Sequence, residues 1–186
     1  MKIQLSEASV SDAIQRLKTL QDNIQVANEM IVEELVSKGE EQANFYHNTA
    51  ATQGVVDTYI DSDLQLNGRK SNGNIYMTGP SAVYFEFGTG EEGASSGHPL
   101  KWQTNVRLNA YNSGPFVSRH INKAGRHYWF IPKNKYWSES PYVKENGYTE
   151  GIPAGKVMYD TTRYIRFIKN TVVKKNLEGA IKKFNK

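Results

Sequence analysis

The stretch Tyr84-Phe-Glu-Phe-Gly-Thr-Gly90 is the most specific pattern in this 186-residue chain. Three aromatic residues and one carboxylate lead directly into a glycine-flanked turn. If the side chains alternate, Phe85 and Phe87 share one face of a strand and Glu86 lies on the other. Because glycine tolerates positive φ, we expect a strand over 83–87 that ends in a structural turn. The residues of that turn are Glu86, Phe87, Gly88, Thr89 and Gly90.

The glycines that follow also match the G-x-G-x-x-G spacing of dinucleotide-binding loops, from Gly88 to Gly93. That motif requires a helix whose first amides hold a pyrophosphate, whereas residues 93–99 read as a loop. Glu91 and Glu92 would place negative charge where the phosphates should bind. A structural turn is therefore the better interpretation.

A long amphipathic helix is expected near the N-terminus. Between residues 10 and 36 the apolar positions are spaced by three, four or seven residues, as on one stripe of a helix. They are Val10, Ile14, Leu17, Ile24, Ile31 and Leu35. We expect this stripe to be buried in the core, with a partner helix as the other interpretation. Gly39 interrupts the pattern, although residues 40–46 can extend the helix.

A β-hairpin is expected over residues 55–79. Apolar and polar residues alternate toward Leu66, as in a strand with one wet face. Two Asn-Gly pairs within residues 67–73 supply turn chemistry, and residues 74–78 read as the returning strand. Together with the strand over 83–87, this predicts an α+β fold with a small antiparallel meander.

The remainder of the chain predicts one domain, 1–186, with a long mobile insertion at about 89–126, rich in Gly, Ser and Asn. A further strand is expected over residues 127–131. A C-terminal helix that packs on the sheet is expected to begin at Ile152-Pro153-Ala154 and to reach Phe184.

The sequence contains few residues in patterns typical of a catalytic site. The chain has no cysteine, and its histidines, His47, His98, His120 and His127, lack the spacing of a helix-borne metal site. We therefore expect neither enzymatic activity nor a cofactor. For Glu86 a structural hydrogen bond to turn amides is preferred over catalysis. A hydrolase would require a pocket that brings Glu86 close to His98 or His127.

Charge divides the chain sharply. Residues 1–100 contain six Lys/Arg and fourteen Asp/Glu, whereas residues 101–186 contain seventeen and five, so the halves carry −8 and +12. Two solvated surfaces or a charge dipole for subunit contacts both fit this division. Basic residues also interleave with aromatic residues, which suits either nucleic acid or an acidic protein neighbour. The expected interaction residues are Trp129, Trp137, Lys174, Lys175, Lys182 and Lys183.

Two motifs carry a resemblance to a known family. Glu86-Phe87-Gly88-Thr89 and the helix entrance over residues 151–158 resemble those of the phage neck family, the tail-completion proteins similar to gene product 10 of phage Hong Kong 97. The resemblance implies a structural virion protein of a tailed phage, a prophage or a phage-like contractile particle. Such a subunit forms part of the neck or tail-completion ring that joins head to tail. A nucleic-acid-binding protein that uses the basic, aromatic-rich C-terminal half is the alternative.

The partners implied are copies of the chain itself in a ring and neighbouring head-closure, tail-tube or tail-terminator proteins, with possible weak contact to DNA and none to a membrane. The N-terminal residues lack the pattern of a signal peptide, and the chain has no apolar run of about 20 residues. We therefore expect the protein in the bacterial host cytoplasm during assembly and then in the virion.

Overall fold

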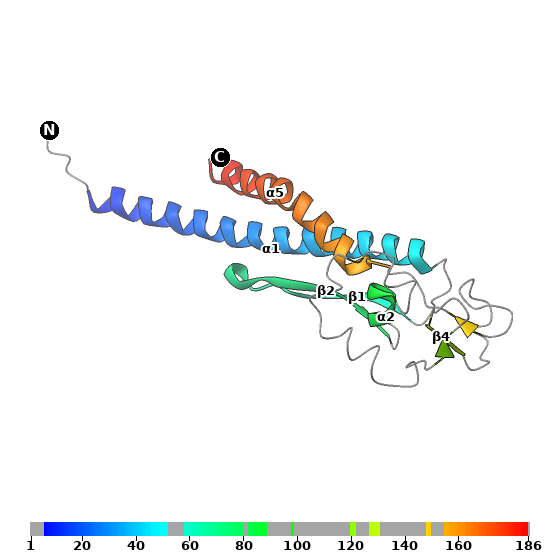
Figure 1. The fold of residues 1–186 in the computed structure, drawn as a ribbon. Coiled ribbons are helices and arrows are strands. Elements are labelled where there is room, and N and C mark those ends of the chain that lie inside the picture. Colours follow the sequence, from blue (N-terminus) through cyan, green and yellow to red (C-terminus); the bar gives the residue numbers. More distant parts are fainter. Residues whose placement is uncertain are drawn as a thin grey trace. The chain divides into compact units, whose positions relative to one another are not determined.

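The fold is α+β, as expected, in the computed structural model shown in Figure 1. The structure describes residues 6–51, 58–79, 82–88, 98, 120–121, 127–130, 148–149 and 155–185. The longer elements are α1 (Glu7–Ala51), β1 (Tyr59–Gln65), β2 (Asn72–Thr78), α2 (Ala82–Phe87) and α5 (Val157–Phe184). The chain contacts cluster into two compact units, described separately below. Unit 1 comprises residues 1–39, 62–75 and 164–186, and unit 2 comprises residues 40–61 and 76–163. The single domain expected over 1–186 stays a prediction.

Helix α1 is longer than the sequence pattern indicated. It begins after Ser6, whose side-chain oxygen accepts the Ser9 amide at 3.2 Å as an N-cap. The helix also continues through Gly39, where an interruption was expected. A side chain at Gly39 would collide with Ile75 of β2 and Ile165 of α5. Glycine is therefore present for close packing in unit 1, not as a helix breaker.

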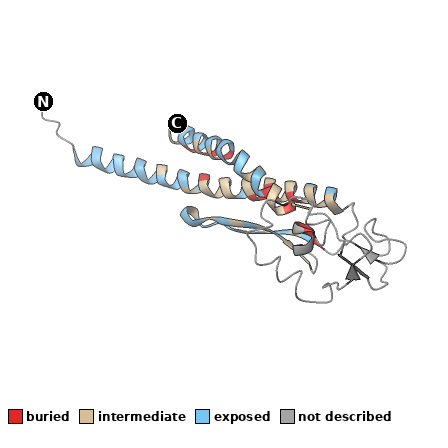
Figure 2. Ribbon diagram, viewed as in Figure 1, coloured by how far each residue is buried: buried red, intermediate tan, exposed pale blue. Residues whose placement is uncertain are grey.

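The apolar stripe of α1 is only partly buried, so the expected burial is wrong for its N-terminal half. Val10, Ile14, Leu17 and Ile24 are 41%, 50%, 64% and 45% exposed. Burial begins at Ala27 and includes Val36 (Figure 2). Two features give the reason. The end of α5 lies beside Arg16, where the guanidinium stacks over the Phe184 ring, so Val10 and Ile14 lie beyond it. Leu17 and Ile24 line an open groove between α1 and α5.

The hairpin is confirmed. β1 and β2 form a two-stranded antiparallel sheet, and the 3₁₀ turn Gly68–Lys70 lies at its tip. Helix α1 holds this tip through Gly68: the Asn28 side chain donates to its carbonyl at 2.5 Å, and Glu29 accepts its amide at 2.7 Å. Burial alternates along the first residues of β1, as period-two patterning predicts.

Residues 83–87 are helical, so the expected third strand of the meander is wrong. Helix α2 follows a turn in which the Ala82 amide donates to the Gly79 carbonyl at 3.1 Å. A strand would turn Phe85 and Glu86 to opposite faces. In the helix both are buried, at 3% and 7% exposure. The helical conformation therefore allows the Phe85 ring and the neighbouring Glu86 carboxylate both to be buried.

A second, three-stranded sheet consists of β3 (His120–Ile121), β4 (His127–Phe130) and β5 (Tyr148–Thr149), with β4 in the middle. Both pairings are antiparallel; Ile121 lies opposite His127, and Phe130 opposite Tyr148. The strand expected over 127–131 is confirmed for residues 127–130. The two-residue strands were not predicted, because so short a segment has no measurable period.

In unit 1, α5 lies antiparallel to α1 and is attached to it through Glu34. The Lys175 ammonium lies 3.0 Å from both Glu34 carboxylate oxygens. The Asn176 side chain also donates to Glu34 at 3.0 Å, and Lys38 lies 3.9 Å away. The Asn176 hydrogen bond, followed by that from Lys175, lowers the pKa of Glu34 below its usual value.

We predict that Glu34→Gln lowers the melting temperature more near pH 7 than at about pH 3. A carboxylate whose pKa is lowered in the folded state stabilises the fold above its unfolded pKa. That stabilisation is lost as the pH falls through the folded pKa. A loss of about 1 kcal/mol corresponds to roughly 2–4 °C. Thermal melts at both pH values test this, with the exposed neighbour Glu33→Gln as control. Equal losses at both pH values would contradict it.

Candidate functional site

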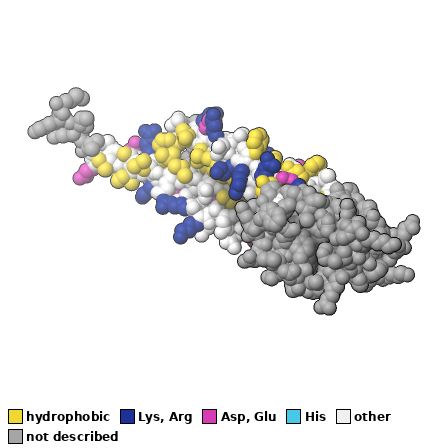
Figure 3. Space-filling view, viewed as in Figure 1, with side chains coloured by type: hydrophobic (Ala, Val, Ile, Leu, Met, Phe, Trp, Pro, Cys, Tyr) yellow, Lys and Arg dark blue, Asp and Glu magenta, His cyan; other side chains and the backbone are white. Residues whose placement is uncertain are grey.

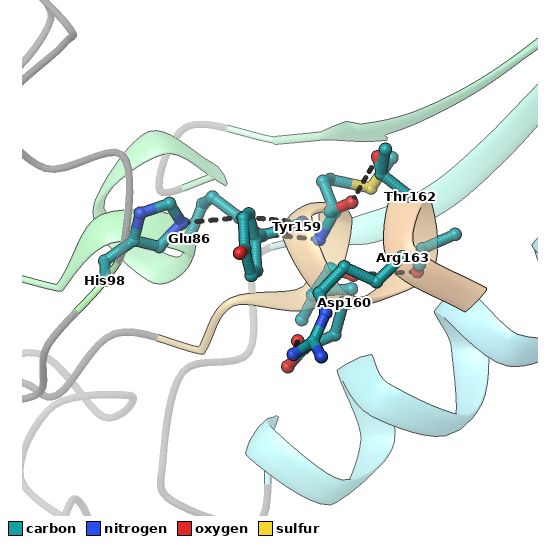
Figure 4. A network of polar contacts seen from close by, with 9 residues as sticks. Glu86, His98, Tyr159, Asp160, Thr162 and Arg163 are labelled. Atoms are coloured by element: carbon teal, nitrogen blue, oxygen red, sulfur yellow. Dashed lines mark hydrogen bonds and ion pairs between the residues drawn. The ribbon is translucent and has the colours of Figure 1, made fainter. Parts of the chain in front are cut away.

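The site of interest lies in unit 2, where the Glu86 side chain meets the beginning of α5 (Figure 4). One carboxylate oxygen of Glu86 accepts the Met158 amide at 2.9 Å, and the other accepts the Tyr159 amide at 2.9 Å. The first amides of a helix have no partner within it, and the helix dipole favours a negative charge there. Glu86 therefore caps α5 from 72 residues earlier in the chain.

Two backbone hydrogen bonds complete this junction. The Gly155 amide donates to the Phe85 carbonyl at 2.7 Å, and the Lys156 amide donates to the Glu86 carbonyl at 3.2 Å. Lys156 has a φ of 57°, in the left-handed region. The chain therefore turns immediately before Val157, where the helix begins. The predicted start at 152–154 lies outside the described residues, and the observed start is later.

His98 joins the same network. Its Nε2 atom lies 3.2 Å from a Glu86 carboxylate oxygen, and its ring packs edge-on against Tyr159 at 5.6 Å between centroids. The histidine is only 1% exposed. With Nε2 protonated, the ring donates to a carboxylate that already accepts two amides.

This contact partly meets the criterion stated for a hydrolase, because Glu86 does lie beside His98. The surroundings favour a structural role. Each Glu86 oxygen already accepts an amide of α5, and both side chains are almost closed to solvent. The side chain of His127 is not described. A hydrogen bond from Glu86 to turn amides was expected, and the described amide donors belong to α5.

A cluster of apolar side chains packs next to the junction. Phe85 and Val157, at 3% and 0% exposure, form its centre. Side chains from α1, both hairpin strands and α5 surround them: Tyr46, Ala50, Ile60, Met77 and Met158. His47 of α1 packs edge-on against Phe85 at 5.3 Å and hydrogen-bonds Thr58 at 2.8 Å. Phe85 and Val157, the residues immediately before Glu86 and Met158, therefore pack the two sides of the junction together.

The predicted structural turn is present in part. Gly88 has a φ of 72°, as expected for the exit from the Glu-Phe-Gly-Thr motif. Glu86 and Phe87 belong to α2 and not to a strand. Thr89 and Gly90 lie outside the described residues, as does most of the insertion expected at about 89–126.

The predicted interaction residues are only partly described, so their grouping into one site stays a prediction. Trp129 lies in β4, opposite Thr149, but its side chain is not described, and Trp137 lies outside the described residues. Lys174 lies 3.9 Å from Glu178 on the same helix, while Lys175 binds Glu34 of its own chain. Lys182 and Lys183 are exposed in the last turn of α5. Their role in binding a partner stays a prediction.

Sequence reasoning named His98 beside Glu86 only as the sign of a hydrolase, and it missed the two α5 amides as partners of Glu86. The available signal was weak: a single carboxylate between aromatic residues, with a helix start some 70 residues later. In the part of the chain that the structure describes, no group of three or more His, Cys, Asp or Glu residues is arranged to hold a metal ion. None of the helices described there combines the length and apolar character that a membrane span requires.

Comparison with protein-family models, with curated proteins and with solved structures finds no match to this chain.

We predict that Glu86→Ala destabilises the protein by about 2–4 kcal/mol, because two part-buried amides lose their acceptor. Glu86→Gln should cost less, since it keeps one acceptor oxygen but loses the negative charge. Chemical denaturation of the two variants and the wild-type protein measures both effects. A neutral Glu86→Ala substitution would show that the cap does not stabilise α5.

We also predict that Gly88→Val destabilises the protein by about 1–3 kcal/mol, because a β-branched residue is strained at a φ of 72°. Gly179→Val is a useful comparison: this glycine lies within α5, has no positive φ and has open space where a side chain would project. Thermal unfolding distinguishes the two. An equal shift for both variants would indicate a general effect of valine and not strain at residue 88.

Proposed function

We propose that this chain is a structural subunit of the neck or tail-completion ring that joins head to tail in a tailed phage, a prophage or a phage-like contractile particle. One observation carries the proposal. The two motifs on which the family resemblance rests have described residues that meet in space: Glu86 of the first motif accepts the amides of Met158 and Tyr159, at the start of the helix to which the second motif leads. The motifs therefore act as two halves of one structural junction.

The chemistry of the junction supports a structural role. A catalytic carboxylate needs an oxygen that can reach a substrate. Both oxygens of Glu86 are engaged by α5 amides, and His98 adds a third contact. This arrangement holds α2 against the start of α5, which is what a subunit of a permanent particle requires.

The surfaces of the two long helices support an assembling protein. Helix α1 carries eight acidic and three basic residues, a net charge of −5, whereas α5 carries two and seven, a net charge of +5. Exposed apolar side chains accompany these charges, including Leu17 at 64%. Apolar surface bordered by charge is typical of a face that a partner covers.

A nucleic-acid-binding function is the second candidate, and one observation favours it. Phe167 of α5 is 84% exposed, and the neighbouring side chains of Arg166 and Lys169 are exposed as well. An uncovered aromatic ring beside cations suits base stacking and phosphate contact. A band shift with duplex or single-stranded DNA that weakens steeply with salt would support this function.

We predict that deleting the gene from a phage or prophage that carries it leaves DNA-filled heads and separate tails. A joining subunit acts after packaging and after tail assembly, so both parts should form normally. Electron microscopy of the lysate decides the outcome, and supplying the wild-type protein should restore complete particles. Complete particles without the protein, or empty heads alone, would contradict the proposed function.

A further inference from the structure

The N-terminal half of α1 carries an apolar seam that the structure leaves open. Val10, Leu17 and Ile24 recur every seven residues and are 41%, 64% and 45% exposed. Ala13 and Leu20 occupy the intermediate positions. This is the heptad spacing of a helix that packs along another helix. Figure 3 shows hydrophobic side chains gathered toward this end of the chain, with Lys and Arg side chains beside them.

A groove opens beside the C-terminal part of this seam, entirely within unit 1. Its volume is about 650 Å³. The lining includes Leu17, Leu20 and Ile24 from α1, Val173 and Leu177 from α5, and Arg69 from the hairpin tip. Arg16 of α1 lies over the Phe184 ring of α5 at 5.6 Å. The two helices thus form two walls of an apolar site that a further helix can complete.

We propose that this groove receives the first turns of α1 from a second copy of the chain. Those turns present Val10 and Ile14, which are 41% and 50% exposed and lie outside the groove lining. They are also acidic, because residues 7–15 contain Glu7 and Asp12 but no Lys or Arg.

The groove is complementary in charge to those turns. Among the described residues that line the groove, Arg69 is the charged one, and its charge is positive. Apolar contact therefore supplies the attraction, and opposite charges select an acidic helix as the occupant. The first turns of α1 combine both properties, which identifies the second copy as the partner.

The contact uses a different surface on each copy, so it is heterologous. Such contacts repeat from copy to copy and form a ring if the rotation closes. The ring rests on the proposed function, whereas the contact itself can be tested on the purified protein.

Cysteine cross-linking tests the contact cleanly, because the native chain contains no cysteine. Ile14→Cys and Leu177→Cys are prepared as separate proteins with tags of different mass, mixed and oxidised. We expect a disulfide-linked mixed dimer. Val26→Cys is the matched control, since Val26 is 49% exposed but lies on the opposite side of α1 from the seam. Mixed with Leu177→Cys, it should give only background cross-linking.

Two outcomes of the cross-linking would overturn the proposal. Absence of the mixed dimer at the highest soluble concentration would show that the groove does not receive this helix. Predominant dimers of Ile14→Cys with itself would show that the seams pair with each other by two-fold symmetry.

A second measurement does not depend on cysteine geometry. Ile14→Glu should weaken self-association by about tenfold or more in sedimentation experiments, because it places a charge in an apolar contact. Its melting temperature should be unchanged, since the side chain is half exposed in the single chain. Val26→Glu should leave both properties unchanged. Wild-type association by Ile14→Glu would contradict the proposal.

The failure of this inference is distinguishable from failure of the proposed function. If head–tail joining requires the protein but the mixed dimer does not form, the ring uses another surface. If the mixed dimer forms but deletion of the gene leaves complete particles, the contact stands and the function in joining does not.

Discussion

The cap that Glu86 forms on α5 is the interaction on which the junction in unit 2 depends. Two part-buried amides at a helix start need an acceptor, and here one carboxylate from α2 supplies both of its oxygens. The requirement explains why residues 82–87 are helical, since Phe85 must enter the core while Glu86 faces α5. It also explains the left-handed turn at Lys156, which sets the point where α5 begins.

The same interaction bears on function because both oxygens of the Glu86 carboxylate already accept hydrogen bonds from α5. Glu86 and His98 lie side by side, and the Glu86 carboxylate accepts the first amides of α5. Among the described residues, groups that a partner can reach include the charges of α1 and α5 and several exposed apolar side chains. Those features suit a subunit whose contacts with other chains complete its structure.

Local patterns were sufficient for much of the fold. The hairpin follows from period-two alternation and Asn-Gly turns, and both long helices follow from apolar spacing. The segment 83–87 was harder, because five largely aromatic residues fit either period over so short a length. Its helical conformation depends on the hydrogen bonds from the Met158 and Tyr159 amides to Glu86. Those residues are distant in the sequence, so no local pattern reveals them.

The sequence by itself determined the α+β class, the hairpin and the positive φ of Gly88, because each arises from neighbouring residues. Only the tertiary structure decided that Gly39 continues a helix, since the reason is the close approach of Ile75 and Ile165. It alone showed that Ile14 and its neighbours stay exposed. Periodicity reports which face of a helix is apolar, but whether another element covers that face depends on the lengths and positions of distant parts of the chain.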